Sequence, residues 1–323
     1  MGNLPAARVT PSRPFWNVGV DYAGPIWLRT SKGRGQHASK AFFVVFVCLC
    51  SRAIHLDVVS DYSADAFLAA LRRFVARRGL CHTIYSDCGT TFVGADSQLR
   101  AMFTASSKDG QRIAARVAEE RIRWRFNPPA APNFGGIWEA VVKSAKHHLR
   151  RVLGEAKLTF EEMTTLLAQI EACLNSRPIQ AISDDPEDFE ALTPGHFLIG
   201  SSLDAVPEPS FSEVPMTRWS RWQLLQRMRD RFWERWSAEY LHTLAHRPKW
   251  TKACEEIRIG RLCLLRSETT PPNRWPLARI ERLYPGEDGQ VRVVDVRTAT
   301  SCFKRPVSKL VLLPESVTKE ANG

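Results

Sequence analysis

The chain has 323 residues, a formal net charge of +11 and a pI near 9.5, with 44% hydrophobic and 24% charged residues. This length suits two or three domains of an ordinary globular protein, and the basic balance favours a polyanionic partner, although many proteins are modestly basic without one. No run of eighteen apolar residues exists and residues 1–14 lack an apolar core, which argues against a membrane span or a signal peptide.

The first part of the chain predicts strand-strand-strand-helix-strand-helix-strand-helix, the order of an RNase H-like α/β core with a mixed five-stranded sheet and flanking helices. The glycine-proline pair after Ala23 reads as a turn that ends the first strand. Ser63 is expected to cap the first helix and Gly79 to end it. Strands are expected at 15–22, 41–49, 52–59, 83–86 and 121–126, and helices at 65–74 and, partly exposed, at 95–118.

The prolines at 128, 129 and 132 are expected to break the chain before a helix that opens after the glycine pair 135–136. A second helix follows, with Thr159 and Glu162 in the spacing of a capping box. The later elements are expected to be helices at 137–153, 159–176 and 219–244, an irregular linker at 183–217, and short strands from 257 onward that form a small β-barrel-like module.

Eight cysteines are scattered singly, without a CxxC pair or a Cys/His cluster, so no zinc is expected in this chain. Several lie in apolar stretches, where a reduced thiol is the usual state. His242 and His246 have metal-ligand spacing, but without a third ligand a structural role is favoured.

Three acidic residues stand out. Asp21 lies at the end of the first strand, Asp87 follows the strand at 83–86, and Glu139 lies near the start of the helix after the glycine pair. Each alone is explained by a turn, a cap or a helical ion pair with Lys143. Together they fit a two-metal phosphoryl-transfer site, because the two strands are expected to be neighbours and hard cations such as Mg²⁺ take oxygen ligands.

The segment 121–151 contains seven Lys or Arg residues and one acid, Glu139. Lys143 and Lys146 lie four and seven residues beyond Glu139, on its side of the helix. Together with Arg150 they are predicted to contact the phosphates of a nucleic acid that enters the site.

Several segments resemble the integrase of Bel/Pao-type LTR retrotransposons. They are VGVDYAGP, SDYSADAFLAALRRFVARRG, TIYSDCGTTFVGA, PPAAPNFGGIWEAVVKSAK, QIEACLNSRPI, ALTPGHFLIG, RWSRWQLLQRMRDRFWERWSAEYL and RPVSKLVLLP. The resemblance runs from about Phe15 to the C-terminus. It implies an RNase H-like DDE polynucleotidyl transferase that uses Mg²⁺ or Mn²⁺ at Asp21, Asp87 and Glu139. It further implies double-stranded DNA as substrate, a homo-multimer and action in the nucleus.

The chain departs from that family in two ways. Cys88 and Thr91 stand where asparagines are common, in an active-site loop that would also include Gly89, Gly135 and Gly136. Cysteine and threonine replace the hydrogen bonds of an amide poorly, so weaker activity is one expectation. No ligands of the upstream zinc-binding domain precede Phe15, so Met1 is either a true start or a boundary within a longer polyprotein.

The expected domains are a leader at 1–14, the catalytic core at 15–205, a linker and basic-aromatic helix at 206–250, the terminal module at 251–316 and a tail at 317–323. The aromatic residues of the long helix are expected to pack rather than to stack on bases. The basic residues of that helix and of the terminal module fit either DNA contact or a solvated surface. Two alternatives to an integrase are a truncated or domesticated DNA-binding protein without catalysis and, less favoured, a nuclease acting on RNA–DNA hybrids.

Overall fold

The computed structural model describes residues 5–31, 37–87, 90–104, 122–126, 132–204, 220–245, 257–266 and 270–314, without the side chains at 90, 99–104 and 132–142. The chain divides into two compact units. The first comprises Met1–Leu174 and Val214–Met228, and the second Asn175–Glu213 and Arg229–Gly323. Residues 175–204, which the sequence analysis assigned to the catalytic core, therefore group with the terminal strands.

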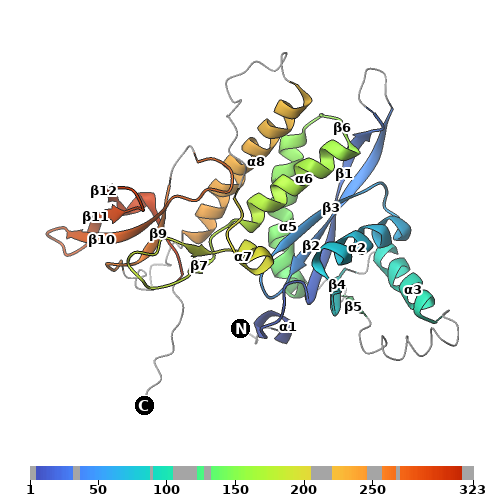
Figure 1. Cartoon of the computed structure of the whole chain (residues 1–323), viewed down its shortest axis with the longest axis horizontal. Helices are drawn as coiled ribbons and strands as arrows, with labels where there is room; N and C mark the ends of the chain where they lie inside the picture. The colour runs from blue at the N-terminus through green and yellow to red at the C-terminus, as the bar shows by residue number, and fades with distance from the viewer. Residues whose placement is uncertain are drawn as a thin grey trace. The chain divides into compact units, whose positions relative to one another are not determined.

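The first unit is built on a six-stranded sheet of order β3-β2-β1-β4-β5, with β6 pairing to β1 (Figure 1). Strands β1, β2 and β3 form an antiparallel meander, and β4 and β5 run parallel to β1. This is the topology of an RNase H-like core, and it confirms the predicted fold class. The elements are α1 (Ala6–Val9), β1 (Asn17–Arg29), β2 (Ala38–Cys48), β3 (Ile54–Val59), α2 (Ala64–Arg78), β4 (Thr83–Ser86), α3 (Thr90–Thr104), β5 (Arg123–Phe126), α5 (Pro132–Leu153), β6 (Leu158–Thr159) and α6 (Phe160–Asn175).

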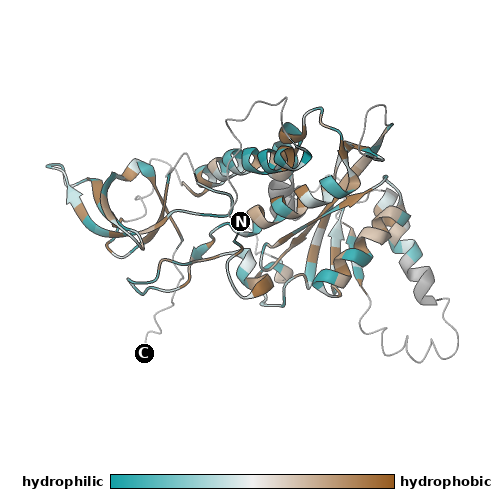
Figure 2. Ribbon diagram, turned by 45° about the horizontal axis from the view of Figure 1, so that its top comes forward, coloured by the Kyte–Doolittle hydropathy of each residue, from teal (hydrophilic) through white to brown (hydrophobic). Residues whose placement is uncertain are grey.

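Helices cover both faces of this sheet, and the run Phe43–Cys48 of β2 is accordingly apolar and buried on both faces (Figure 2). On one face, Phe46 of β2 stacks on Phe74 of α2 with ring centroids 4.3 Å apart, and both side chains are fully buried. Val45, its neighbour in β2, points to the opposite face, as alternation along a strand requires. Asp21 is the cross-strand partner of Val45 and therefore lies on the face away from Phe74.

Strand β1 continues through the Gly24-Pro25 pair, where the sequence predicted a turn, so that prediction was wrong. A register shift between Ala23 and Ile26 absorbs the proline, which has no N–H to give to the ladder. At Gly24 a Cβ atom would lie 2.6 Å from the Phe42 ring, so only glycine fits. Asp21 consequently lies inside a long strand and not at its end.

Two helices begin earlier than predicted. Helix α5 begins at Pro132 and includes Gly135 and Gly136, because proline is well tolerated in the first helical turn and its φ angle suits a helix. Helix α3 begins at Thr90, five residues before the expected start. Phe92 is buried there between the rings of Tyr22 and Phe67, and this packing outweighs the turn-like composition of the segment.

The predicted capping box at the start of α6 is present. The Thr159 N–H donates to Glu162 Oε2 (2.9 Å), and the Glu162 N–H donates to Thr159 Oγ1 (3.2 Å). Arg221, the first residue of α8 (Arg221–Leu244), donates from Nε to Glu162 Oε1 (2.8 Å). This hydrogen bond is the main reason why the pKa of Glu162 falls to about 2.

The second unit contains a five-stranded antiparallel sheet of order β12-β11-β10-β9-β13, as expected for the terminal module. Helix α7 and strand β8, which pairs with β7 just before the predicted linker, lie where the sequence predicted only an irregular linker. The Thr193 N–H caps α7 by donating to His196 Nδ1 (3.1 Å), and Pro194 occupies its first position. The elements are β7 (Gln180–Ala181), β8 (Ala191–Leu192), α7 (Pro194–Ile199), β9 (Leu262–Leu265), β10 (Leu277–Pro285), β11 (Val291–Arg297), β12 (Cys302–Pro306), a 3₁₀ turn (Val307–Lys309) and β13 (Leu310–Leu312).

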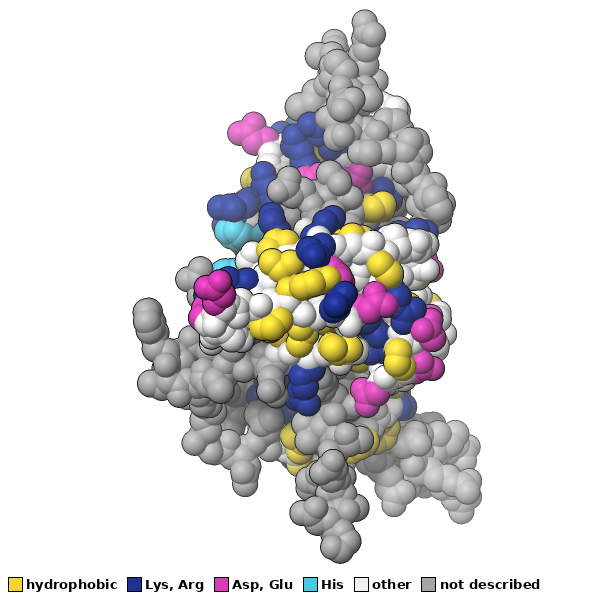
Figure 3. Space-filling view, turned by 90° about the vertical axis from the view of Figure 1, so that its left-hand side faces the viewer, with side chains coloured by type: hydrophobic (Ala, Val, Ile, Leu, Met, Phe, Trp, Pro, Cys, Tyr) yellow, Lys and Arg dark blue, Asp and Glu magenta, His cyan; other side chains and the backbone are white. Residues whose placement is uncertain are grey.

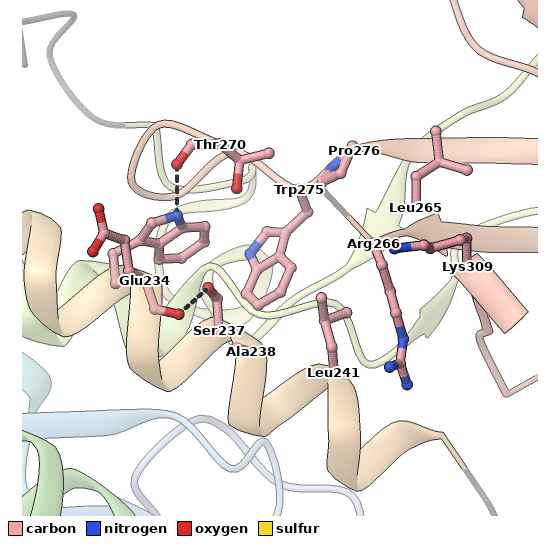
Figure 4. Close-up of a pocket in the computed structure, with 11 residues that line it drawn as sticks. Glu234, Ser237, Ala238, Leu241, Leu265, Arg266, Thr270, Trp275, Pro276 and Lys309 are labelled. Carbon is pink, nitrogen blue, oxygen red and sulfur yellow. Dashed lines mark hydrogen bonds between the residues drawn. The ribbon is translucent and has the colours of Figure 1, made fainter. Parts of the chain in front are cut away.

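The aromatic residues in the part of α8 that belongs to this unit pack inside it, as predicted. Trp233 is buried and donates from its indole N–H to the Thr270 carbonyl (2.9 Å), and its ring meets Trp275 edge to face at 4.8 Å (Figure 4). The Trp275 indole in turn donates to Ser176 Oγ (3.2 Å). A cavity of about 370 Å³ lies beside these rings and is lined at one end by Arg266 and Lys309. Trp222 is exposed, and Trp219 lies outside the described residues.

The Glu162–Arg221 pair gives a stability prediction. Replacing Glu162 by alanine should lower the free energy of unfolding at neutral pH by about 2 kcal/mol, because it removes a cap and a charge-assisted hydrogen bond. Because the folded pKa is depressed, this contribution is present above the ordinary carboxyl pKa of 4.5 and is lost as the pH falls toward 2. Urea unfolding across this pH range measures it.

The matched control is Glu161→Ala, an exposed neighbour in the same helical turn, which should cost less than about 0.5 kcal/mol. A difference between the Glu162 variant and the unmodified protein that did not shrink on acidification would contradict the assigned role of the ion pair.

Candidate active site

Asp21 and Asp87 come from neighbouring parallel strands at matching positions. The last pair in the β1–β4 register is Gly19 with Tyr85, and each aspartate lies two residues farther along its chain. Because parallel neighbours are about 4.8 Å apart, the register brings both aspartates to the same edge of the sheet, Asp21 within β1 and Asp87 one residue past the end of β4.

The negative charges of both aspartates act on Tyr62. It follows β3, its side chain is 45% exposed, and its ring contacts that of Tyr22 with centroids 4.8 Å apart. Desolvation, followed by the negative charges of Asp87 and Asp21, raises the pKa of the Tyr62 phenol. Both aspartates therefore influence the pKa of the same tyrosine at the surface.

Helix α5 brings a third predicted residue toward this face. The ammonium of Lys146 lies 2.7 Å from Asp21 Oδ2, while Asp21 Oδ1 accepts the N–H of Tyr22 at 2.7 Å. Glu139 lies seven residues before Lys146 in the same helix, two turns and about 10 Å away along the axis. Its position is thus on the Lys146 side of the helix, but its side chain lies outside the described part of the structure.

A cavity of about 550 Å³ opens at Asp21, and its remaining lining is basic. All three predicted phosphate contacts, Lys143, Lys146 and Arg150, line it. His147 and Arg151 also line it, and the sequence analysis missed them. Their spacing from Lys143 by four and eight residues, which keeps them on one side of a helix, was the signal that could have found them.

Of the two positions where the chain departs from the family pattern, the structure describes Thr91 but not Cys88. Thr91 lies in the first turn of α3, is 4% exposed, and donates from its hydroxyl to the Tyr62 carbonyl (3.1 Å). Its hydroxyl therefore ties α3 to the segment that follows β3. Cys88 and Gly89 lie outside the described residues.

The donor set at this edge fits a hard divalent cation. Carboxylate oxygens are the ligands that Mg²⁺ and Mn²⁺ prefer, and the Lys146 ammonium already places a positive charge beside Oδ2 of Asp21. Among the described residues, no three His, Cys, Asp or Glu side chains gather closely enough to hold a metal. Asp21 and Asp87 would supply two carboxylates, and the Glu139 position would supply the third.

The other predicted positions are dispersed. His242 is exposed on α8, and His246 lies outside the described residues. On the terminal sheet, Arg297 pairs with Glu187 (2.9 Å) and Arg292 with Asp288 (2.9 Å). Lys and Arg side chains on the face shown in Figure 3 are mixed with hydrophobic and acidic ones and do not form one basic patch. No described helix has the length and apolar composition needed to cross a membrane.

Comparison with known proteins gives limited information. Residues 220–313, from the start of α8 to the end of the terminal sheet, match a family of unknown function (DUF5641). No curated protein sequence matches the chain. Since this match covers less than half of the chain, it does not assign the whole protein to a family.

Two solved structures are similar. The simian T-cell lymphotropic virus intasome in complex with PP2A regulatory subunit B56 gamma aligns at 11% identity and a TM-score of 0.38, covering 97% of this chain and 84% of its own. The HTLV-2 integrase catalytic core domain in complex with magnesium, in a trimeric form, aligns at 14% identity and a TM-score of 0.34, covering 58% and 97%. Scores this low do not establish common descent or function, so the fold assignment above rests on strand order and direction.

Thr91 provides a test of the local architecture. Thr91→Val should lower the free energy of unfolding by about 1 kcal/mol, because it leaves a buried position without its hydrogen bond to the Tyr62 carbonyl. Thr91→Ser keeps the hydroxyl and should cost clearly less. Equal losses in the two variants, measured by thermal unfolding, would mean that the hydrogen bond contributes nothing.

Proposed function

We propose that this chain is an integrase-like polynucleotidyl transferase of a Bel/Pao-type LTR retrotransposon. It would trim the 3′ ends of the element DNA and then join the new 3′-hydroxyl groups to target DNA. The observation that carries this proposal is the pairing of β1 with β4, which brings Asp21 and Asp87 to one edge beside a basic cavity. Carboxylates for a metal pair and cations for phosphates are the two requirements of such a reaction.

The residues of the site have distinct roles in this proposal. Asp21, Asp87 and Glu139 hold Mg²⁺ or Mn²⁺, which, when bound, stabilises charge on the attacked phosphate and helps to deprotonate the attacking water or 3′-hydroxyl. Lys143, His147 and Arg150 line the cavity and hold the phosphates on either side of the scissile bond. Because no covalent protein–DNA bond is needed, the protein contributes mainly orientation and charge neutralisation.

The partner is double-stranded DNA, both as element ends and as target. Strand transfer at two paired ends requires more than one active site, so we propose a homo-multimer that acts in the nucleus. The net charge of +11 supports association with DNA, since basic surfaces raise the local concentration of phosphates.

The second candidate is a non-catalytic DNA-binding protein derived from such an integrase. Cys88 in the expected loop and the ion pair of Asp21 with Lys146 favour it, because a carboxylate held by an ammonium also fits a purely structural site. It predicts salt-dependent DNA binding without any metal-dependent joining.

The decisive experiment is a joining assay with labelled duplex ends, target DNA and Mn²⁺ or Mg²⁺. The unmodified chain should give joined products. Asp21→Asn, Asp87→Asn or Glu139→Gln should reduce them at least about 100-fold, because each removes one metal-ligand charge, while DNA binding stays within about threefold.

The control is Glu155→Gln, an exposed carboxylate just beyond the end of α5, which should join DNA normally. Joining that survived in the Asp21 variant would refute the site. Salt-sensitive binding with no joining by the unmodified chain would favour the second candidate.

A further inference from the structure

The most informative contact outside the expected chemistry is the one between Lys146 and Asp21. Asp21 lines the cavity, its Oδ1 accepts the N–H of Tyr22, and its Oδ2 is left for another partner. The Lys146 ammonium lies 2.7 Å from that oxygen. Any cation that uses Oδ2 of Asp21 must therefore first displace Lys146.

We propose that Lys146 holds the place of the divalent cation at Asp21, and that cation binding releases it into the basic cavity to bind a DNA phosphate. This inference rests on the proposed function, because it assigns a metal to Asp21. Lys146 is thus a positioning residue that couples the metal to DNA, and not a fixed phosphate contact.

Electrostatics explains why a placeholder is needed. The β1–β4 register ends at Gly19 and Tyr85, two residues before Asp21 and Asp87, so the two negative charges lie at the same edge of the sheet and repel each other. Opposite charges at hydrogen-bond distance attract even in a largely aqueous environment. The Lys146 ammonium therefore reduces the repulsion between the aspartates while the metal is absent.

Exposure explains why the placeholder can leave. The side chains of Lys146 and Asp21 are 33% and 29% exposed, and ion pairs with this much solvent access contribute little net stability. A divalent cation carries twice the charge of the ammonium, and Asp21 together with Asp87 would hold it. The flexible four-carbon stem of lysine allows the released ammonium to reach another part of the same cavity.

Release of Lys146 couples the two ligands. Once displaced, its charge joins Lys143, His147, Arg150 and Arg151 along the cavity, where a phosphate backbone can bind it. DNA that holds Lys146 away from Asp21 in turn leaves Asp21 free for the metal. Coupling between two binding sites is reciprocal, so each ligand should strengthen the binding of the other.

The test is Mn²⁺ binding to the full chain without DNA, measured by calorimetry or electron paramagnetic resonance. Lys146→Met keeps the length of the side chain and removes the competing charge. It should raise Mn²⁺ affinity about three- to tenfold, as expected from removal of a partly exposed ion pair and of repulsion by the ammonium. Lys146→Arg retains the charge and should stay close to the unmodified protein.

The matched control is Lys143→Met, which removes a charge from the same cavity one turn earlier in α5. Its effect should be clearly smaller than that of Lys146→Met. Equal affinities in the unmodified chain, Lys146→Met and Lys143→Met would overturn the inference, as would the absence of Mn²⁺ binding in all three. Similar gains in both methionine variants would also overturn it, because they would indicate a general charge effect.

A second measurement tests the coupling. Addition of duplex DNA should raise Mn²⁺ affinity more in the unmodified chain than in Lys146→Met, because the variant has no ammonium to displace. An equal gain in both proteins would contradict the coupling. The joining assay tests the proposed function separately. If the unmodified chain joins DNA but all variants bind Mn²⁺ with equal affinity, the proposed role of Lys146 is wrong and the proposed enzymatic function still stands.

Discussion

The parallel pairing of β1 with β4 is the constraint on which the site depends. It joins segments more than sixty residues apart and fixes Gly19 opposite Tyr85, so the two aspartates that follow must be neighbours. A slip of one residue would turn one carboxylate to the opposite face of the sheet. The relative position of the two aspartates, and with it the chemistry proposed for the site, therefore depends on the register of this short strand pair.

Packing on both faces of the sheet holds that register. The Phe46–Phe74 stack and the buried rings of Phe67 and Phe92 fill the space on the side of α2, where a slip would expose apolar surface. On the other side of the sheet, α5 lies against β1 and places Lys146 at Asp21. Packing of the hydrophobic core thus fixes the geometry of the polar site, and the polar site itself contributes little to the stability of the fold.

Much of this arrangement could be read from the sequence because it depends on local patterns. Apolar runs of strand length predicted the strands of the meander, and Ser63 and Thr159 predicted two helix starts through side-chain capping. These signals need no knowledge of distant residues. The pairing of the first strand with the fourth also followed from topology, and on it rests the prediction that Asp21 and Asp87 act together.

The failures have a common physical cause, which is that tertiary contacts override local signals. Gly24 and Pro25 signal a turn, yet the strand continues because a bulge absorbs them against Phe42. Thr91 signals a polar loop, yet its hydroxyl and the neighbouring Phe92 are held by residues far away in the chain. The ion pair of Lys146 with Asp21 joins residues 125 positions apart, and no local pattern could reveal it.

Lysine is better suited than arginine to the position beside Asp21. An arginine would offer a rigid planar fork that binds a carboxylate through two parallel hydrogen bonds, which would make exchange with a metal harder. Arginine does occur at the far end of α5, where Arg150 and Arg151 lie in the last turn and interact favourably with the helix dipole. Those two guanidinium groups keep their charge whatever Lys146 contacts. In the proposed exchange, the cavity would therefore remain attractive to phosphate in both states, and Lys146 alone would decide whether Asp21 is available to a metal.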